Sequence, residues 1–145
     1  MTSLRAVVLT LVLVSLAACT PKPVLVAYDG AVSKSRSVFV ATSRNALGGD
    51  PPAYGGARAA EVHLAEYAVS IPPLRTPGDL RLPSGDPDPQ TDFLTLGTET
   101  FAGEAGFIAA VNRALAPLPA ADRHITLYVH GYNTGFATSV LRAAQ

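Results

Sequence analysis

Four residues that follow an apolar run carry the clearest chemical signal in the sequence. Residues 125–129 are nearly all apolar or β-branched, and His130, Gly131, Tyr132 and Asn133 come directly after them. A strand that ends in such a turn can present backbone N–H groups, and a glycine lets the chain approach a substrate closely. These four residues are therefore our candidate catalytic residues, forming a turn that holds the negative charge developing on a carbonyl oxygen during acyl transfer.

The other groups that acyl transfer needs are missing from the sequence. A Gly-x-Ser-x-Gly motif, which places a serine nucleophile on a tight strand-to-helix turn, occurs nowhere in the 145 residues. The chain by itself lacks nucleophile, acid and base, and whether it is an enzyme stays open. The alternative interpretation of residues 130–133 is an ordinary strand-to-helix turn, because glycine and asparagine are common turn formers.

Metal, disulfide and redox chemistry are not indicated. The sequence has one cysteine, so no internal disulfide can form, and its three histidines, His63, His124 and His130, lack the spacing of a zinc site. Asp86 and Asp88, in a Pro-rich stretch, could suggest calcium, but turn formation is the interpretation that we adopt. We expect no metal and no cofactor.

The composition is typical of a globular protein and argues against polyanion partners. Apolar residues make up 48% of the 145 residues and charged residues 15%, which fits one folded domain. Eleven basic residues balance eleven acidic ones, and there is no long basic run. We therefore expect no nucleic-acid partner.

The N-terminus is typical of an export signal. Residues 1–5 form a short basic region and residues 6–16 an apolar one. An apolar run of about eleven residues is too short to cross a bilayer core of about 30 Å, which takes about 20 residues in a helix. We therefore predict a signal peptide over residues 1–18 rather than a transmembrane anchor.

The end of this signal, Leu16-Ala17-Ala18-Cys19, resembles the lipobox of bacterial lipoproteins. The resemblance implies cleavage before Cys19 and lipidation of Cys19, and two or three acyl chains give a lasting membrane anchor in the bacterial cell envelope. Thr20 rather than aspartate follows the cysteine, which favours the periplasmic face of the outer membrane over the inner membrane. A plain signal peptide with a chance cysteine is the alternative.

The next segment is predicted to be a tether that leads into the folded part of the chain. Residues 19–36 carry Pro, Lys and Ser with little periodicity, which favours a lipidated tether. The folded part is predicted over residues 37–145. It begins with a short strand over 37–41 and a loop at 42–45, and the Gly- and Pro-rich residues 48–56 are predicted to lack regular structure.

The middle of the chain predicts one more strand and a long loop. Apolar and mixed residues alternate over 62–71, which predicts a strand at the antiparallel edge of an otherwise parallel sheet. Six prolines lie between residues 72 and 89 and remove backbone donors, so this stretch is predicted to be an extended surface loop.

A helix is predicted between this loop and the candidate turn. Phe101, Ile108, Val111 and Leu115 fall on one side of a helix over residues 100–116. Prolines at positions 117 and 119 end it. We assign this helix to packing, with no chemistry of its own.

The candidate turn itself is predicted to join a central strand to a second helix. Residues 125–129 suit a central parallel strand that is covered on both faces. Beyond the turn, Phe136 and Val140 repeat at helical spacing together with Ala143 or Ala144. Either Asn133 or Thr134 is expected to cap this helix.

The order of these features resembles an uncharacterised family of bacterial α/β-hydrolase lipoproteins. The matching features are the lipobox, residues 38–44 (Val-Phe-Val-Ala-Thr-Ser-Arg), the Pro-rich loop, and residues 128–136 (Tyr-Val-His-Gly-Tyr-Asn-Thr-Gly-Phe) with Arg142 and Gln145. The resemblance implies the α/β fold class, with residues 37–145 forming the incomplete N-terminal part of an α/β-hydrolase fold. Such a fold has a mostly parallel sheet with flanking helices.

The resemblance also implies a function. The chain would be the N-terminal fragment of an exported, lipid-anchored serine hydrolase of small-molecule acyl substrates such as esters, with the catalytic triad downstream. The backbone N–H of Tyr132 would be one oxyanion donor, Gly131 would allow close approach, and Asn133 would brace the loop or cap the helix. His130 would brace the turn rather than act as base, because the base histidine of this family follows the nucleophile in the chain.

A second candidate function is a non-catalytic envelope lipoprotein that uses the fold as a binding module. A downstream Gly-x-Ser-x-Gly motif would distinguish the hydrolase from this alternative.

Overall fold

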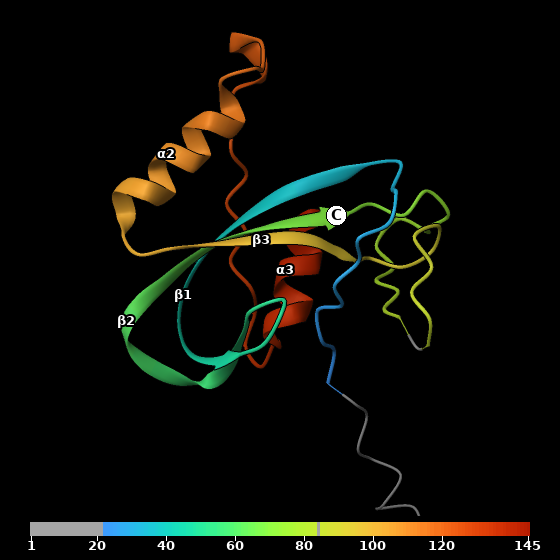
Figure 1. Cartoon of the computed structure of the whole chain (residues 1–145), viewed down its shortest axis with the longest axis horizontal. Coiled ribbons are helices and arrows are strands. Elements are labelled where there is room, and N and C mark those ends of the chain that lie inside the picture. Colours follow the sequence, from blue (N-terminus) through green and yellow to red (C-terminus); the bar gives the residue numbers. More distant parts are fainter. Residues whose placement is uncertain (1–21, 84) are drawn as a thin grey trace, which may run out of the picture.

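Three antiparallel strands form the only sheet within residues 22–83 and 85–145, the part of the chain described by the computed structural model. The strands are β1 (Ser35–Gly48), β2 (Ala53–Ser70) and β3 (Thr95–Phe101), in the order β1-β2-β3. Two helices, α2 (Glu104–Leu115) and α3 (Phe136–Ala144), and a short 3₁₀ turn, η1 (Ala120–Asp122), follow the strands (Figure 1).

The hairpin of β1 and β2 is the largest element of the fold. Its ladder is regular from Ser35↔Ser70 to Thr42↔His63, and register shifts interrupt it beyond Thr42. The strand expected over 37–41 is confirmed within β1. The loop expected at 42–45 is wrong, because bulges absorb the irregularity and let pairing continue to the hairpin tip.

The tip of this hairpin is shorter than the sequence indicated. Residues 48–56 were expected to lack regular structure, yet β2 begins at Ala53. Gly48 and Gly49 have φ values of 75° and 98°, a left-handed conformation that favours glycine, and they reverse the chain within a few residues. The expected strand over 62–71 is confirmed as antiparallel, but β2 is the central strand of the sheet rather than its edge.

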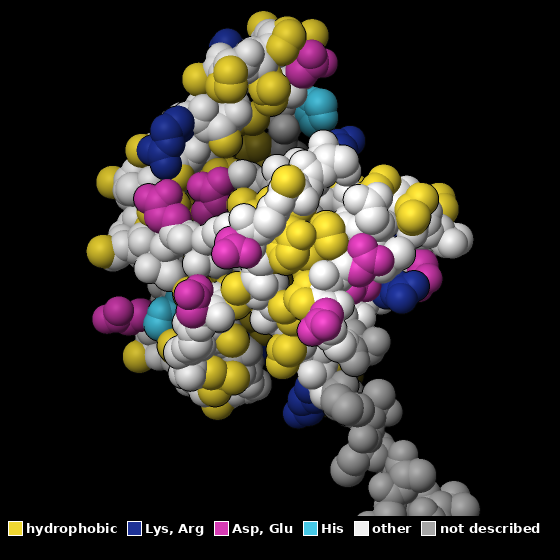
Figure 2. Space-filling model, turned by 45° about the vertical axis from the view of Figure 1, so that its right-hand side comes forward, with side chains coloured by type: hydrophobic (Ala, Val, Ile, Leu, Met, Phe, Trp, Pro, Cys, Tyr) yellow, Lys and Arg dark blue, Asp and Glu magenta, His cyan; other side chains and the backbone are white. Residues whose placement is uncertain are grey.

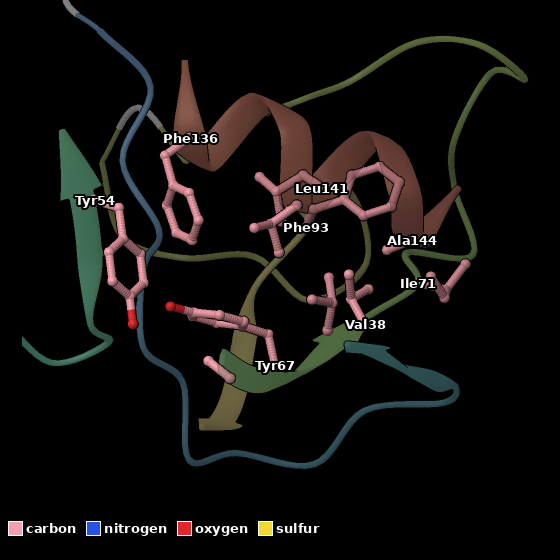
Figure 3. Close-up of a cluster of buried hydrophobic side chains, with 11 residues drawn as sticks. Val38, Tyr54, Tyr67, Ile71, Phe93, Phe136, Leu141 and Ala144 are labelled. Carbon is pink, nitrogen blue, oxygen red and sulfur yellow. The ribbon is translucent and has the colours of Figure 1, made fainter. Parts of the chain in front are cut away.

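Helix α3 covers the face of the sheet that holds the core. Tyr67 and Val69 of β2 are fully buried, and the ring of Phe136 lies edge-on to Tyr67 with ring centroids 5.7 Å apart (Figure 3). The second ring against Phe136 is Tyr54, at 4.9 Å. Loop and strand residues complete this core, which comprises Val38, Tyr54, Ala65, Tyr67, Val69, Ile71, Phe93, Phe136, Val140, Leu141 and Ala144.

Helix α2 makes a smaller contact with the opposite face. Phe107 lies edge-on to Phe39 and to Phe101, each at 5.7 Å. The expected helix is confirmed, but it begins at Glu104 because Phe101 is the last residue of β3. Its expected apolar side is partly wrong: Ile108 is 55% exposed, whereas Ala110 is buried.

The Pro-rich stretch is a loop, as expected, and packs on the sheet. None of its described residues between Ile71 and Leu94 belongs to a helix or strand. Asp88 accepts hydrogen bonds from Gln90 N–H and the Thr91 hydroxyl, which is turn formation by an aspartate. Strand β3, which follows this loop, was not expected from the sequence.

The residues before β1 are joined to the edge of the sheet. Thr95 N–H donates to Val26 O at 2.8 Å, and Tyr28 N–H donates to Thr95 O at 2.9 Å. Residues 26–28 of the expected tether therefore contact β3. The predicted signal peptide over residues 1–18 and the lipidation site Cys19 lie outside the described residues. No helix in the described part of the chain is long and apolar enough to cross a membrane.

The expected α/β-hydrolase sheet with mostly parallel strands is wrong. The chain forms a small antiparallel sheet of three strands with two helices. Residues 125–129, expected to be its central parallel strand, belong to no strand, and Leu127 and Val129 are 86% and 80% exposed. The physical reason is pairing: β1, β2 and β3 follow one another antiparallel, and residues 125–129 run past them without a ladder of their own.

Candidate functional site

The four candidate residues form an exposed turn that leads into α3. The chain arrives in an extended conformation, turns at residues 130–134, and enters the helix with Gly135 as N-cap residue. Asn133 has a φ of 57°, a left-handed conformation that asparagine tolerates better than most residues. The expected cap by Asn133 or Thr134 is wrong, because no side chain caps the helix.

Hydrogen bonds from the side chain of Arg44, in β1, join this turn to the hairpin. Its Nη2 donates to Thr134 O at 2.8 Å and lies 3.4 Å from His130 Nε2, while Nη1 donates to Gly55 O at 3.1 Å. Arg44 lies where the β1–β2 register shifts, opposite Arg58. One guanidinium therefore connects both strands of the hairpin with the turn.

Within the described part of the chain, the hydrogen-bond partners of the His130 ring are Gly131 O and Arg44. Its Nδ1 lies 3.0 Å from Gly131 O, and its Nε2 faces the guanidinium of Arg44. No hydroxyl or carboxylate of the described residues forms a hydrogen bond with the ring. These contacts are those of a side chain that braces the turn, and they include none of the partners that activate a nucleophile.

Two backbone N–H groups of the turn have no acceptor in the part of the chain that the structure describes. They are the N–H groups of Tyr132 and Asn133. The Tyr132 side chain is fully exposed. Free N–H groups, the adjacent N-terminus of α3 and the cation of Arg44 together make this turn suited to a negatively charged group.

Packing does not require a glycine at position 131. A Cβ added there would meet only Thr134 Oγ1, at 3.9 Å, which is an ordinary contact. The φ of Gly131 is also outside the left-handed region. The fold would thus accept a side chain at this position, and the space that the glycine leaves is open to a ligand.

Sequence reasoning missed Arg44 and Thr134 as members of this site. Thr134 contributes a backbone carbonyl, which sequence does not mark. Arg44 carried one usable signal: it is a lone charge in the otherwise uncharged segment 37–49. The structure brings Arg44 to His130 across a separation of 86 residues.

A concave region lies beside β3 and the residues that precede β1. It is an open cleft of about 720 Å³, lined by Ala27, Tyr28, Asp29, Asp50, Pro51, Pro87, Thr95, Leu96, Gly97 and Thr98. Its two carboxylates face no lining cation. None of the four turn residues lines this cleft, and the described residues contain no cluster of three or more metal-ligating side chains.

Two tyrosines of the core have raised pKa values. Burial raises the pKa of Tyr67 well above its usual value, and the neighbouring Tyr54 adds to this rise. Burial also raises the pKa of Tyr54. The Tyr67 hydroxyl donates a hydrogen bond to Pro52 O, at 2.8 Å, at the hairpin tip. This hydrogen bond stabilises the neutral form of Tyr67. Both groups belong to the core rather than to the candidate turn.

Charged side chains are dispersed over one face of the molecule. On the face shown in Figure 2, acidic, basic and apolar side chains are interspersed, and among the described side chains that are visible there neither charge forms a continuous patch.

Comparison with known proteins adds no relative. No protein-family model matches the chain, no curated protein matches it, and no solved structure matches it. Any function assigned to the turn at residues 130–134 therefore rests on its own residues and geometry.

Proposed function

We propose that the chain is part of an exported, lipid-anchored serine hydrolase of acyl substrates, to which it contributes the oxyanion-binding turn at residues 130–133. One observation carries the proposal. The N–H groups of Tyr132 and Asn133 are without protein acceptors among the described residues, and they lie beside Arg44 and the N-terminus of α3.

The chemistry of such a turn is electrostatic. When a nucleophile attacks an ester carbonyl, the carbonyl oxygen gains negative charge, and a pre-positioned N–H stabilises that charge. One such donor lowers the barrier by about 2.7–4 kcal/mol. The open space at Gly131 lets the carbonyl approach the backbone N–H of the turn.

The remaining catalytic groups would come from elsewhere in the protein. The sequence contains no Gly-x-Ser-x-Gly motif, so the proposal places the serine, the acid and the base histidine in a segment after Gln145. His130 is not the base, because both of its ring nitrogens are engaged by Gly131 O and Arg44.

The membrane anchor is the second part of the proposal. Acylation of Cys19 would hold the protein on a bacterial envelope membrane, with the periplasmic face of the outer membrane favoured. Labelling cells with a radioactive fatty acid tests this: the protein should incorporate label, and Cys19→Ala should abolish incorporation.

Gly131→Val in the complete gene product tests the turn. The branched side chain would fill the space beside the N–H donors, and we expect kcat for a p-nitrophenyl ester to fall about 10²–10³-fold. Gly85→Val is the matched control, because an added Cβ at this loop position meets nothing within 4 Å. Activity that survives Gly131→Val unchanged would refute the oxyanion role.

A non-catalytic envelope lipoprotein remains the second candidate, and one observation favours it. Ile125, Leu127 and Val129 are 67%, 86% and 80% exposed, which is unusual for three alternating apolar residues and suits a binding segment. A fluorophosphonate probe separates the candidates, because it labels an activated serine covalently. Labelling of the complete gene product supports the hydrolase, and absence of labelling supports the binding lipoprotein.

A further inference from the structure

The contacts of Arg44 determine where the proton of His130 must be. A guanidinium has donors only, so the 3.4 Å contact between Arg44 Nη2 and His130 Nε2 requires Nε2 to be the acceptor. A neutral imidazole with an acceptor Nε2 carries its proton on Nδ1. Nδ1 in turn lies 3.0 Å from Gly131 O, which can only accept. Both contacts require the same tautomer.

The same guanidinium uses its planar geometry to join three chain segments. Nη1 donates to Gly55 O in β2, and one N–H of Nη2 donates to Thr134 O. The other N–H of Nη2 faces His130. A lysine has a single ammonium on a flexible stem and lacks this fixed fork.

We propose that Arg44 is a positioning residue that fixes His130 in the Nδ1–H tautomer and thereby holds the turn at residues 130–134 against the β1–β2 hairpin. Its contribution to oxyanion binding rests on the proposed function. The tautomer does not, because it follows from contacts within the protein.

The fixed tautomer has a consequence for the turn. With its proton on Nδ1, His130 satisfies Gly131 O and leaves no ring N–H directed away from the turn. The turn therefore presents backbone N–H groups, rather than imidazole, to a ligand. In the other tautomer, Nε2–H would oppose the donors of Arg44, and of the two contacts between Arg44 and the turn only the hydrogen bond to Thr134 O would remain.

Nitrogen NMR of the intact protein in detergent, labelled with ¹⁵N-histidine, tests the proposal directly. At pH 8 we expect the His130 signals of a protonated Nδ1 and an unprotonated Nε2 in the wild-type protein. Arg44→Ala should move the Nε2 signal toward the protonated position, and Arg44→Lys should restore the wild-type signals only in part. A wild-type protein with its proton on Nε2 would overturn the proposal even if no variant folded.

Arg58→Ala is the matched control, because Arg58 lies opposite Arg44 in the ladder and carries the same charge. It should leave the His130 signals unchanged. The signals of His63 and His124 report whether each variant keeps its fold. His130 signals that are identical in the wild-type protein and in folded Arg44→Ala would also overturn the proposal.

The outcome separates this inference from the proposed function. An Nδ1–H tautomer that depends on Arg44, in a protein without esterase activity, would retain the positioning role and reject the hydrolase. An active hydrolase in which His130 has the other tautomer would retain the hydrolase function and reject the positioning role of Arg44.

Discussion

Strand β2 and residues 125–129 are both mostly apolar, yet they lie in opposite environments. Residues 125–129 have the larger share of β-branched residues, with Ile125, Thr126 and Val129. Tyr67 and Val69 of β2 are fully buried, whereas Leu127 and Val129 are more than three-quarters exposed. The difference lies in their neighbours: β2 pairs on both sides, and residues 125–129 pair with nothing in the described chain. A strand-forming sequence gives an extended backbone, but burial requires a partner.

The two helices also differ in how many of their residues are buried. Helix α3 inserts Phe136, Val140 and Leu141 into the core, while α2 has one buried residue, Ala110. Figure 1 shows α2 projecting from one end of the sheet and α3 lying against it. The free energy of folding should therefore be concentrated in the hairpin and α3.

Leu141→Ala should give the largest loss of stability among the changes that compare these regions. Leu141 is 1% exposed, and truncation of such a leucine leaves a cavity that costs about 2–5 kcal/mol. The free energy of unfolding from urea titration measures the loss. Ile108→Ala in α2 is the control and should cost far less, because Ile108 is 55% exposed. Equal losses in the two variants would contradict the contrast between the helices.

Tyr67→Phe should have a smaller, pH-dependent effect. It removes the hydrogen bond to Pro52 O, which costs about 1 kcal/mol at neutral pH. Burial raises the pKa of Tyr67 above that of the unfolded chain, about 10. The folded state thus keeps a proton that the unfolded state loses, so stability is intact below about pH 10 and declines above it.

The variant should therefore lose less stability than the wild-type protein between pH 9 and pH 11. Urea midpoints at several pH values measure this difference. Parallel decline of the two proteins would show that Tyr67 does not contribute to alkaline unfolding.

Leu127→Ser should have the smallest effect on folding. Leu127 is 86% exposed, and substitutions at such positions usually change stability by less than about 0.5 kcal/mol. Urea titration of the variant beside the wild-type protein gives the value. A loss above 2 kcal/mol would mean that residues 125–129 are buried in the folded protein, and the contrast with β2 would fail.

Local patterns in the sequence predicted some of the local elements. The strand over 37–41, the strand over 62–71 and both helices are confirmed within β1, β2, α2 and α3. Each depends on periodicity within a short window, which side-chain burial on one face imposes.

Features that depend on distant partners were not predicted. Strand β3 has a glycine at 97 and polar residues through Thr98, Glu99 and Thr100, and it is a strand because it pairs with β2. The expected parallel sheet failed for the same reason, since no local pattern specifies which strands pair. The role of Arg44 at the candidate turn depends on a contact across 86 residues.

The hydrogen bonds between residues 26–28 and β3 limit how far the domain can stand from a membrane. If Cys19 carries the proposed lipid anchor, only six residues lie between it and Val26, the first residue bonded to Thr95. The seven Cα-to-Cα steps from Cys19 to Val26 reach at most about 25 Å when the chain is fully extended. The domain would then remain within one protein diameter of the bilayer, and acyl substrates embedded in or leaving that surface would be the ones that it meets first.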